Sequence, residues 1–249
     1  MTDDDKRNPL ANIKSEAELL EFAKELEGKT LAQVVGDIMK SDKSSRVTTK
    51  GNVGYVIEQY FGIKKNSKAE ADIEKLGIEI KSVPLKYDKS RKLLSVKEPL
   101  SLNIINYDEE DKTEDIRDSS LYKKNKKILF VSYLHDELKQ RSEYEIKHVF
   151  LWRMDDKVLE ELNPDYMLIK KKIRDGKAHE IHQTEHKYLT LCPKHCGTFK
   201  NPNCNISKRK QPHSSIPAEV RAFRLKNSYM NMIICRALGK KLEKGGWSI

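Results

Sequence analysis

The chain has 249 residues, enough for one large domain with a buried core. Its 48 Lys and Arg outnumber 38 Asp and Glu, and the formal net charge of +10 favours a polyanion such as nucleic acid as the partner. A lysine-rich surface is also common in proteins that bind no nucleic acid, so charge alone supports this partner weakly. No apolar run is long enough to span a membrane, and the opening MTDDDKRNPL lacks a signal-peptide pattern. We therefore predict a cytoplasmic protein with no membrane partner.

Three helices are predicted within the first 62 residues. The first begins with a capping box formed by Ser15 and Glu18, and the second follows Thr30. The third begins near Gly51 and carries an apolar stripe at helical spacing. Glu58 lies near the edge of that stripe and not on the fully solvated side.

A change to period-two alternation predicts a strand that begins after Gly77 and ends at Pro84. Glu79 and Lys81 share one face of this strand. Four further strands are predicted at Leu102–Tyr107, Ile128–Tyr133, Val149–Trp152 and Tyr188–Leu191. Together they indicate a sheet of about five strands.

Helices are expected to flank this sheet. Asn163 before Pro164 is a helix-start signal for a helix that runs to Lys172. Near the end of the chain, a short strand to Leu225 precedes a helix whose residues around Ile233 are buried. The chain is predicted to be a single α/β domain over residues 1–249, with an N-terminal helical part at 1–50.

The segment ADIEKLGIEIKSVP places Asp72 seven residues before Glu79, and Lys81 two residues after it. Two carboxylates close in space can hold a hard cation such as Mg²⁺, with the carbonyl of Ile80 as a further oxygen ligand. Lys81 could orient a water molecule and offset the charge that builds up on a phosphate. Glu58 is a candidate for a second metal ion or its water shell.

This short string is weak on its own. Charged residues make up 35% of the chain, and an alternating Glu/Lys face is usually only a solvated surface. A longer frame surrounds it: SEAELLEFAKELEGKTLAQVVG, KGNVGYVIEQYFG, GIEIKSVPL, YKKNKKILFV, KYLTLCPK and AFRLKNSYMNMIICRAL, in this order. This frame resembles the MutH family, which includes a mismatch-repair nicking enzyme and type II restriction endonucleases that cut at GATC.

The resemblance implies the restriction-endonuclease-like PD-(D/E)xK fold, a central mixed β-sheet flanked by helices, with Ala71 where the motif name has proline. It implies that Glu58, Asp72, Glu79 and Lys81 are catalytic. It also implies an additional active-site lysine, most simply Lys124, with Lys123 and Lys126 as alternatives.

Family resemblance further implies a DNA-recognition part at about 185–240. Its candidate residues are Pro193, Lys194, Arg221, Arg224 and Lys226, beside Cys192. A lysine in the major groove can donate to guanine O6 and N7, so Lys194 is the candidate for reading the G of GATC. The alternative role for Lys194 is a phosphate contact, which carries no sequence information.

Two features separate the branches of the family. Arg224 replaces the tyrosine of the F-Y-L-K sequence in mismatch-repair members, so the resemblance does not imply their discrimination against methylated adenine for this chain. The run LSLNIINY is closer to the Sau-type restriction branch.

The cysteine and histidine residues near 182–204 offer a rival interpretation of one segment. Cys192, Cys196 and Cys204, with nearby histidines, are residue types that bind structural zinc. Their Cys-x3-Cys-x7-Cys spacing lacks the paired knuckles of a zinc ribbon, so zinc is the minority alternative.

The sequence thus predicts a Mg²⁺-dependent type II restriction endonuclease that cuts double-stranded DNA at GATC and leaves 5'-phosphate ends. The first alternative is a mismatch-repair nicking endonuclease at GATC, and the second is a DNA-binding module that does not cleave. A palindromic site makes a homodimer a further expectation.

Overall fold

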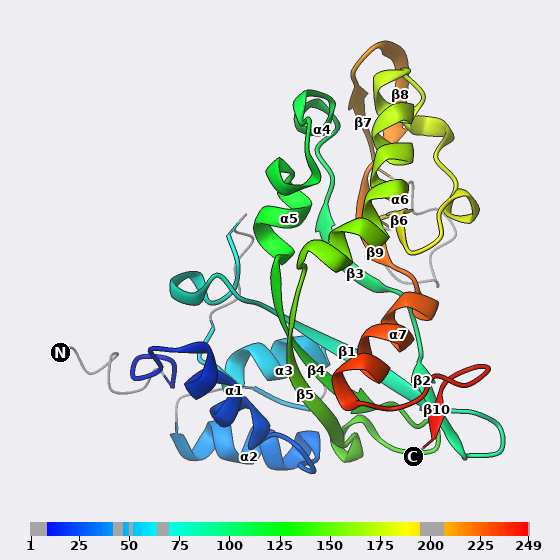
Figure 1. Cartoon of the computed structure of the whole chain (residues 1–249). Coiled ribbons are helices and arrows are strands. Elements are labelled where there is room, and N and C mark those ends of the chain that lie inside the picture. The colour runs from blue at the N-terminus through cyan, green and yellow to red at the C-terminus, as the bar shows by residue number, and fades with distance from the viewer. Residues whose placement is uncertain (1–8, 42–46, 50–51, 64–69, 195–206, 249) are drawn as a thin grey trace. The chain divides into compact units, whose positions relative to one another are not determined.

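The computed structural model describes residues 9–41, 47–49, 52–63, 70–194 and 207–248 (Figure 1). These residues form two compact units, each assembled from separate stretches of chain. The first unit consists of Met1–Lys97, Lys127–Trp152 and Ile233–Ile249, and the second of Glu98–Lys126 and Arg153–Met232. The expectation of one domain over residues 1–249 stays a prediction.

The first unit is built on a five-stranded mixed sheet. Its strands, in spatial order, are β10 (Trp247–Ser248), β2 (Leu93–Val96), β1 (Glu79–Tyr87), β4 (Lys127–Leu134) and β5 (Ile146–Arg153). β1 pairs in parallel with β4 and antiparallel with β2. From Ile128 onward every residue of β4 is buried, as expected for a central strand.

Three helices pack on this sheet: α1 (Glu16–Lys24), α2 (Leu31–Ser41) and α3 (Val53–Tyr60). The predicted capping box is present, since the Glu18 N–H donates to Ser15 Oγ at 3.2 Å and the Ser15 N–H donates to Glu18 Oε2 at 3.3 Å. Asn52 caps α3. The apolar faces of the three helices share one core with β1, β4 and β5. The three predicted helices are confirmed.

The second unit contains a three-stranded antiparallel sheet in the order β3 (Leu100–Ile104), β9 (Arg221–Leu225) and β6 (Leu189–Pro193). A two-stranded hairpin is formed by β7 (Lys208–Gln211) and β8 (Ser214–Glu219). The helices of this unit are α4 (Tyr107–Lys112), α5 (Ser120–Asn125) and α6 (Asp156–Arg174). Helix α7 (Asn227–Leu238) begins in the second unit and ends in the first.

Single turns of 3₁₀ helix connect several of these elements. They lie at Glu74–Leu76, Ile116–Asp118, Arg141–Glu143, Ala178–Glu180 and Gln183–Glu185.

The predicted membership of the sheet is wrong. The segments that form β3 and β6 pair with β9 in a separate sheet, and the short strands β2 and β10 complete the five-stranded one. The strand predicted to reach Tyr107 ends at Ile104, because the Asn106 side chain accepts the Asp108 N–H at 3.2 Å and caps α4.

Two prolines do not act as the sequence predicted. Pro84 does not end β1, which runs to Tyr87. Pairing with β4 continues through Leu85, and pairing with β2 starts only at Leu85, so the missing N–H of Pro84 lies at the end of the ladder with β2. Pro164 does not begin a helix but lies inside α6. The helix starts earlier because the Asp155 side chain caps it through the Val158 N–H at 3.0 Å.

The α/β class with a mixed central sheet flanked by helices is confirmed. Among the helices that the structure describes, none is long and apolar enough to cross a membrane.

Candidate active site

A tight turn before β1 brings Asp72 back alongside the start of that strand. Ile73 and Ile78 form a two-way bridge, with N–H to oxygen distances of 2.9 and 3.3 Å. The turn between them closes at Gly77, whose φ of 64° is in the left-handed region that glycine adopts without strain. This turn places residue 72 opposite residues 79 and 80.

Hydrogen bonds join the two carboxylates and the lysine into one cluster. The Ile80 N–H donates to Asp72 Oδ2 at 2.9 Å, and the Asp72 N–H donates to Glu79 Oε2 at 3.3 Å. Lys81 Nζ lies 2.6 Å from Glu79 Oε1. We call Asp72, Glu79 and Lys81 the carboxylate cluster.

The side chains of Glu79 and Lys81 in this cluster are largely shielded from solvent. The Glu79 side chain is 3% exposed and that of Lys81 is 21% exposed. A buried carboxylate needs partners for its charge, and both oxygens of Glu79 have one. The alternating face predicted for Glu79 and Lys81 is therefore not a solvated surface.

Glu58 belongs to the same unit. It lies on α3 and is half-buried, and α3 contacts β1. The helix approaches closely at Gly54, where a Cβ atom would lie 3.2 Å from Ser82 Oγ. A larger residue at position 54 would push α3, and Glu58 with it, away from the strand that carries Glu79.

The chemistry of these oxygen donors fits a magnesium ion. Magnesium in proteins is commonly held by one or two carboxylates and keeps several waters. Asp72 and Glu79 supply two hard carboxylate ligands, and Ile80 a backbone carbonyl beside them. Within the described ranges no three His, Cys, Asp or Glu side chains gather as a metal-binding group, so a fit to magnesium rests on this pair.

Lys124 lies on α5, in the second unit. It is half-buried, whereas its neighbours Lys123 and Lys126 are exposed. Burial thus distinguishes Lys124 from the two alternatives. Its role at the active site stays a prediction.

The strands β6 and β9 bring several predicted DNA-binding residues together. Pro193 pairs with Arg221 at the end of the two strands, and Thr190 pairs with Arg224. The Lys194 N–H donates to Val220 O at 2.8 Å, and the Lys194 side chain is exposed.

The side chains of the other three basic residues of this group donate hydrogen bonds to other residues of the protein. Arg221 is 6% exposed and donates to the Ile181 carbonyl and, at 3.0 Å, to Glu219 Oε2. Arg224 Nε donates to Ser101 Oγ at 2.9 Å.

Lys226 Nζ donates to the His186 carbonyl. The sequence pattern gave no sign that these three side chains bind within the protein. Lys194 is the member of the group that faces solvent without such a bond in the described part of the chain.

Of the three cysteines in the zinc alternative, Cys192 lies among the described residues. Cys192 is buried, and burial raises the pKa of its thiol above the ordinary value. Cys196 and Cys204 lie outside the described residues.

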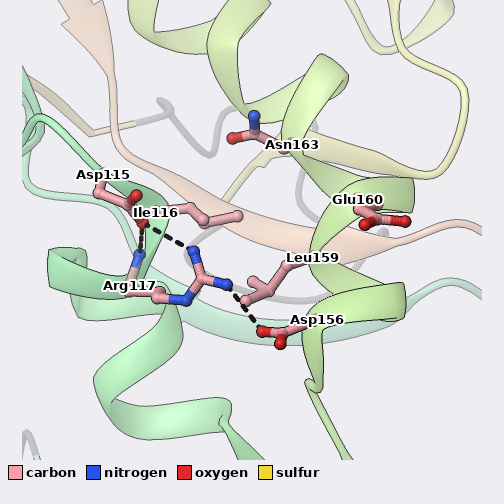
Figure 2. Close-up of a pocket in the computed structure, with 7 residues that line it drawn as sticks. All are labelled: Asp115, Ile116, Arg117, Asp156, Leu159, Glu160 and Asn163. Carbon is pink, nitrogen blue, oxygen red and sulfur yellow. Dashed lines mark hydrogen bonds and ion pairs between the residues drawn. The ribbon is translucent and has the colours of Figure 1, made fainter.

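A polar pocket of the second unit contains none of the predicted site residues. It is lined by Asp115, Ile116, Arg117, Asp156, Leu159, Glu160 and Asn163 (Figure 2). Arg117 Nη2 lies 2.7 Å from Asp156 Oδ1, an ion pair that raises the pKa of the guanidinium further above its ordinary value. Arg117, the basic residue among those that line the pocket, is therefore already paired with a carboxylate of the same pocket.

Comparisons with known proteins identify the family. Residues 61–165 match the family model "DNA mismatch repair enzyme MutH". The matched range contains Asp72, Glu79, Lys81 and Lys124.

Individual relatives come from both branches. The chain is 36% identical over 215 residues to "Type II restriction enzyme Sau3AI" of Staphylococcus aureus, which covers 85% of this chain and 41% of that protein. It is 30% identical over 184 residues to "DNA mismatch repair protein MutH" of Actinobacillus pleuropneumoniae, covering 72% of this chain and 77% of the relative. For the MutH protein of Vibrio campbellii the identity is 24% over 224 residues, covering 89% and 94%.

The chain thus spans about two fifths of the restriction enzyme and nearly the whole of a MutH protein. The predicted family and its restriction-endonuclease-like fold are confirmed, and the prediction of a site-specific deoxyribonuclease is confirmed at the level of the family. The chain belongs to the MutH family, on its Sau3AI-type branch.

Proposed function

We propose that the protein is a Mg²⁺-dependent endonuclease that cleaves both strands of duplex DNA at GATC and leaves 5'-phosphate ends. The observation that carries this proposal is the carboxylate cluster. Glu79 accepts hydrogen bonds from the Asp72 backbone N–H and the Lys81 ammonium group, and the Asp72 carboxylate accepts the Ile80 N–H next to Glu79, each within 3.3 Å. The name of the relative from Staphylococcus aureus, a type II restriction enzyme, supports cleavage of both strands.

Asp72 and Glu79 would hold the metal ion, and Glu58 on the neighbouring α3 would support a second ion or its waters. A bound Mg²⁺ supplies Lewis-acid stabilisation of the phosphate charge and lowers the pKa of a bound water. The Ile80 N–H fixes Asp72 through Oδ2. Among the described residues Oδ1 of Asp72 has no hydrogen-bond partner, so it is available as a ligand.

Lys81 would act on the water and the phosphate. Its Nζ is held 2.6 Å from Glu79 Oε1, so the ammonium group remains beside the carboxylate and does not move freely in solvent. From this position it orients the attacking water and offsets the negative charge of the transition state. Lys124 would add a contact to the neighbouring phosphate.

Base recognition is proposed for Lys194, with Pro193 beside it at the end of β6. Three further basic residues would stabilise this surface through their hydrogen bonds within the protein: Arg221, Arg224 and Lys226. A second copy of the chain on the palindromic site would present a second carboxylate cluster to the other strand.

A nicking endonuclease of mismatch repair is the second candidate. It is supported by the relatives named as mismatch-repair proteins, such as the MutH protein of Vibrio campbellii. Plasmid cleavage at low enzyme concentration separates the two candidates, because a stand-alone restriction enzyme linearises the plasmid and a nickase leaves it as open circles. The non-cleaving module is disfavoured by the intact Asp72, Glu79 and Lys81.

Three variants test the active site: Asp72→Asn, Glu79→Gln and Lys81→Met. Each should lose Mg²⁺-dependent cleavage by roughly 10²-fold or more, since each removes a group that stabilises the transition state. Binding of a GATC duplex should persist, because the DNA-contacting surface is unchanged. Cleavage is followed on agarose gels and binding by fluorescence anisotropy.

The matched control is Lys86→Met, which removes an exposed lysine from the same strand. It should cleave like the unmodified protein. Unchanged cleavage by the Asp72→Asn and Glu79→Gln variants would remove the basis for the proposed site.

A further inference from the structure

The hairpin β7–β8 lies within the predicted DNA-recognition part at about 185–240, but its two lysines are not among the residues predicted to be catalytic or to bind DNA. Lys208 and Lys210 lie two residues apart on β7 and are exposed, while Arg209 between them is half-buried. Arg209 turns inward, where Nη1 donates to Ile105 O at 3.1 Å. The two exposed lysines therefore share the outer face of the strand.

This hairpin starts beside the proposed recognition residue. Val220 accepts the Lys194 N–H through its carbonyl at 2.8 Å and donates its own N–H to Ser207 O at 2.8 Å. Ser207 is the residue before Lys208, so the backbone that carries Lys194 and the base of the hairpin are joined through Val220. Lys208 therefore lies one residue after a backbone partner of Val220, which is also the partner of Lys194.

The tip of the hairpin is fixed to the rest of the second unit. Gln211 is 5% exposed, and its Oε1 accepts the Ala178 N–H at 2.7 Å. His213 Nε2 lies 3.0 Å from both oxygens of Asp111. A Cβ atom on Gly176 would overlap the His213 carbonyl oxygen, so the tip packs directly on the backbone after α6.

The base of the hairpin is fixed in the same way, because the Tyr107 hydroxyl donates to Glu219 O at 2.7 Å. Strand β8 also contacts the 3₁₀ turn at Ala178–Glu180, which follows α6 in the chain. The basic face of the hairpin is held in place before any ligand binds, and a rigid face loses little conformational freedom on binding.

Many basic side chains of this unit are paired with carboxylates. On and near α6 these pairs are Lys170–Glu114, Lys171–Asp175, Lys172–Glu185, Arg174–Glu114 and Arg117–Asp156. Lys208 and Lys210 have no ion-pair partner in the part of the chain that the structure describes. The carboxylate across the hairpin from Lys208, that of Glu219, lies 3.0 Å from Arg221 Nη2. The hairpin thus presents two uncompensated positive charges on a rigid strand.

We propose that the β7–β8 hairpin is a second DNA contact, in which Lys208 and Lys210 bind phosphates of the duplex that flanks the recognised bases. This inference rests on the proposed function. Two residues of a strand span about 6–7 Å. Phosphates of one DNA strand follow each other at about 3.4 Å along the helix axis, so both lysines can reach phosphates of the same strand.

The test compares the salt dependence of DNA binding for the full chain and for the double variant Lys208→Gln/Lys210→Gln. The probes are a duplex of about 25 base pairs with one GATC site and a duplex with that site scrambled, both without Mg²⁺. Each lost phosphate contact lowers the slope of log K against log salt by about 0.9. The variant should therefore lose about 1.8 from the slope on both duplexes, and the ratio of the two affinities should stay unchanged.

The matched control is Lys157→Gln/Lys171→Gln, which removes two exposed lysines from α6 in the same unit. It should keep the original slope, as should Lys208→Arg/Lys210→Arg, which retains both charges. An unchanged slope for the glutamine variant of the hairpin, or an equal fall for the α6 control, would overturn the inference. A loss of affinity for the GATC duplex alone would also overturn it, because phosphate contacts are blind to sequence.

Cleavage assays of the unmodified protein separate this inference from the proposed function. If the protein cuts GATC and the slope does not change, the hairpin contact is wrong and the function stands. If the slope falls and the protein cuts no DNA, the contact stands and the endonuclease proposal is wrong.

Discussion

Glu79 and Lys81 are the residues whose contact was most directly predictable from the chain. Period-two alternation puts them on one face of a strand, and their side chains meet at 2.6 Å. The approach of Asp72 was less predictable, because it depends on the turn that closes at Gly77 and not on any periodicity. Asp72 was predicted as a site residue from the resemblance to the MutH family. The turn explains how this residue reaches Glu79.

Arg221 and Lys226 illustrate what a sequence pattern lacks. A basic residue that reads DNA and one that binds a carbonyl inside the protein look the same in a sequence. In the structure Arg221 and Lys226 donate to the carbonyls of Ile181 and His186. Only burial and partners distinguish these residues from the exposed Lys194.

The buried carboxyl group of Glu110 predicts a pH dependence of the protein's stability. It is 1% exposed, accepts the Tyr166 hydroxyl at 2.7 Å, and burial raises its pKa above the ordinary 4.5. The stability that its protonated form contributes is complete below pH 4.5 and is lost as pH rises through the pKa of the folded state. The Glu110→Gln variant has no proton to lose, so the unfolding free energy of the unmodified protein should fall relative to this variant as pH rises from 4.5.

Urea unfolding at a series of pH values measures this difference. The control is Glu160→Gln at an exposed position of the same unit, which should follow the unmodified protein. A difference between Glu110→Gln and the unmodified protein that stays constant with pH would contradict the assignment.

The elements were predictable where local signals coincide. The capping box of α1 and the apolar stripes of α2 and α3 fix these helices within a few residues. The distribution of strands between sheets was not predictable, because β3, β9 and β6 pair across large distances in sequence. The strands β2 and β10 were missed because four and two residues are too few for a pattern.

Strand β6 supplies a prediction at the scale of elements. Asp165 on α6 accepts three consecutive backbone N–H groups at the start of β6, from Lys187, Tyr188 and Leu189, at 2.7, 2.6 and 2.8 Å. The carboxylate is 4% exposed, so Asp165→Leu would leave buried N–H groups without partners. We expect a loss of roughly 2–5 kcal/mol in unfolding free energy, measured by urea denaturation.

The control for this variant is Asp156→Asn on the same helix. Asp156 is 88% exposed in its pair with Arg117, and exposed ion pairs contribute little. A loss as large for Asp156→Asn as for Asp165→Leu would show that the bonds to β6 are not what stabilises this unit.

The two compact units are interleaved along the chain, which passes between them at residues 97–98, 126–127, 152–153 and 232–233. Neither unit is a continuous piece of sequence. The carboxylate cluster belongs to the first unit, and Lys194 with the β7–β8 hairpin to the second. In the proposed function, the metal-binding carboxylates thus lie in the first unit and the proposed DNA contacts in the second, together with Lys124.

The structure also shows where some of the unpaired positive charge lies. The net charge of +10 indicated a polyanion but no surface. Internal ion pairs neutralise much of the charge near α6, while the hairpin lysines stay without acidic partners among the described residues. The sequence therefore predicted the class of partner, and the structure was needed to propose where that partner binds.

Digestion of unmethylated plasmid DNA with Mg²⁺, followed by sequencing of the ends, tests the proposed endonuclease most directly. We predict linear fragments whose 5'-phosphate ends all map to GATC, with no fragments when EDTA replaces Mg²⁺ or when the plasmid lacks GATC. Persistence of intact plasmid, or ends that map to sequences other than GATC, would contradict the proposed function.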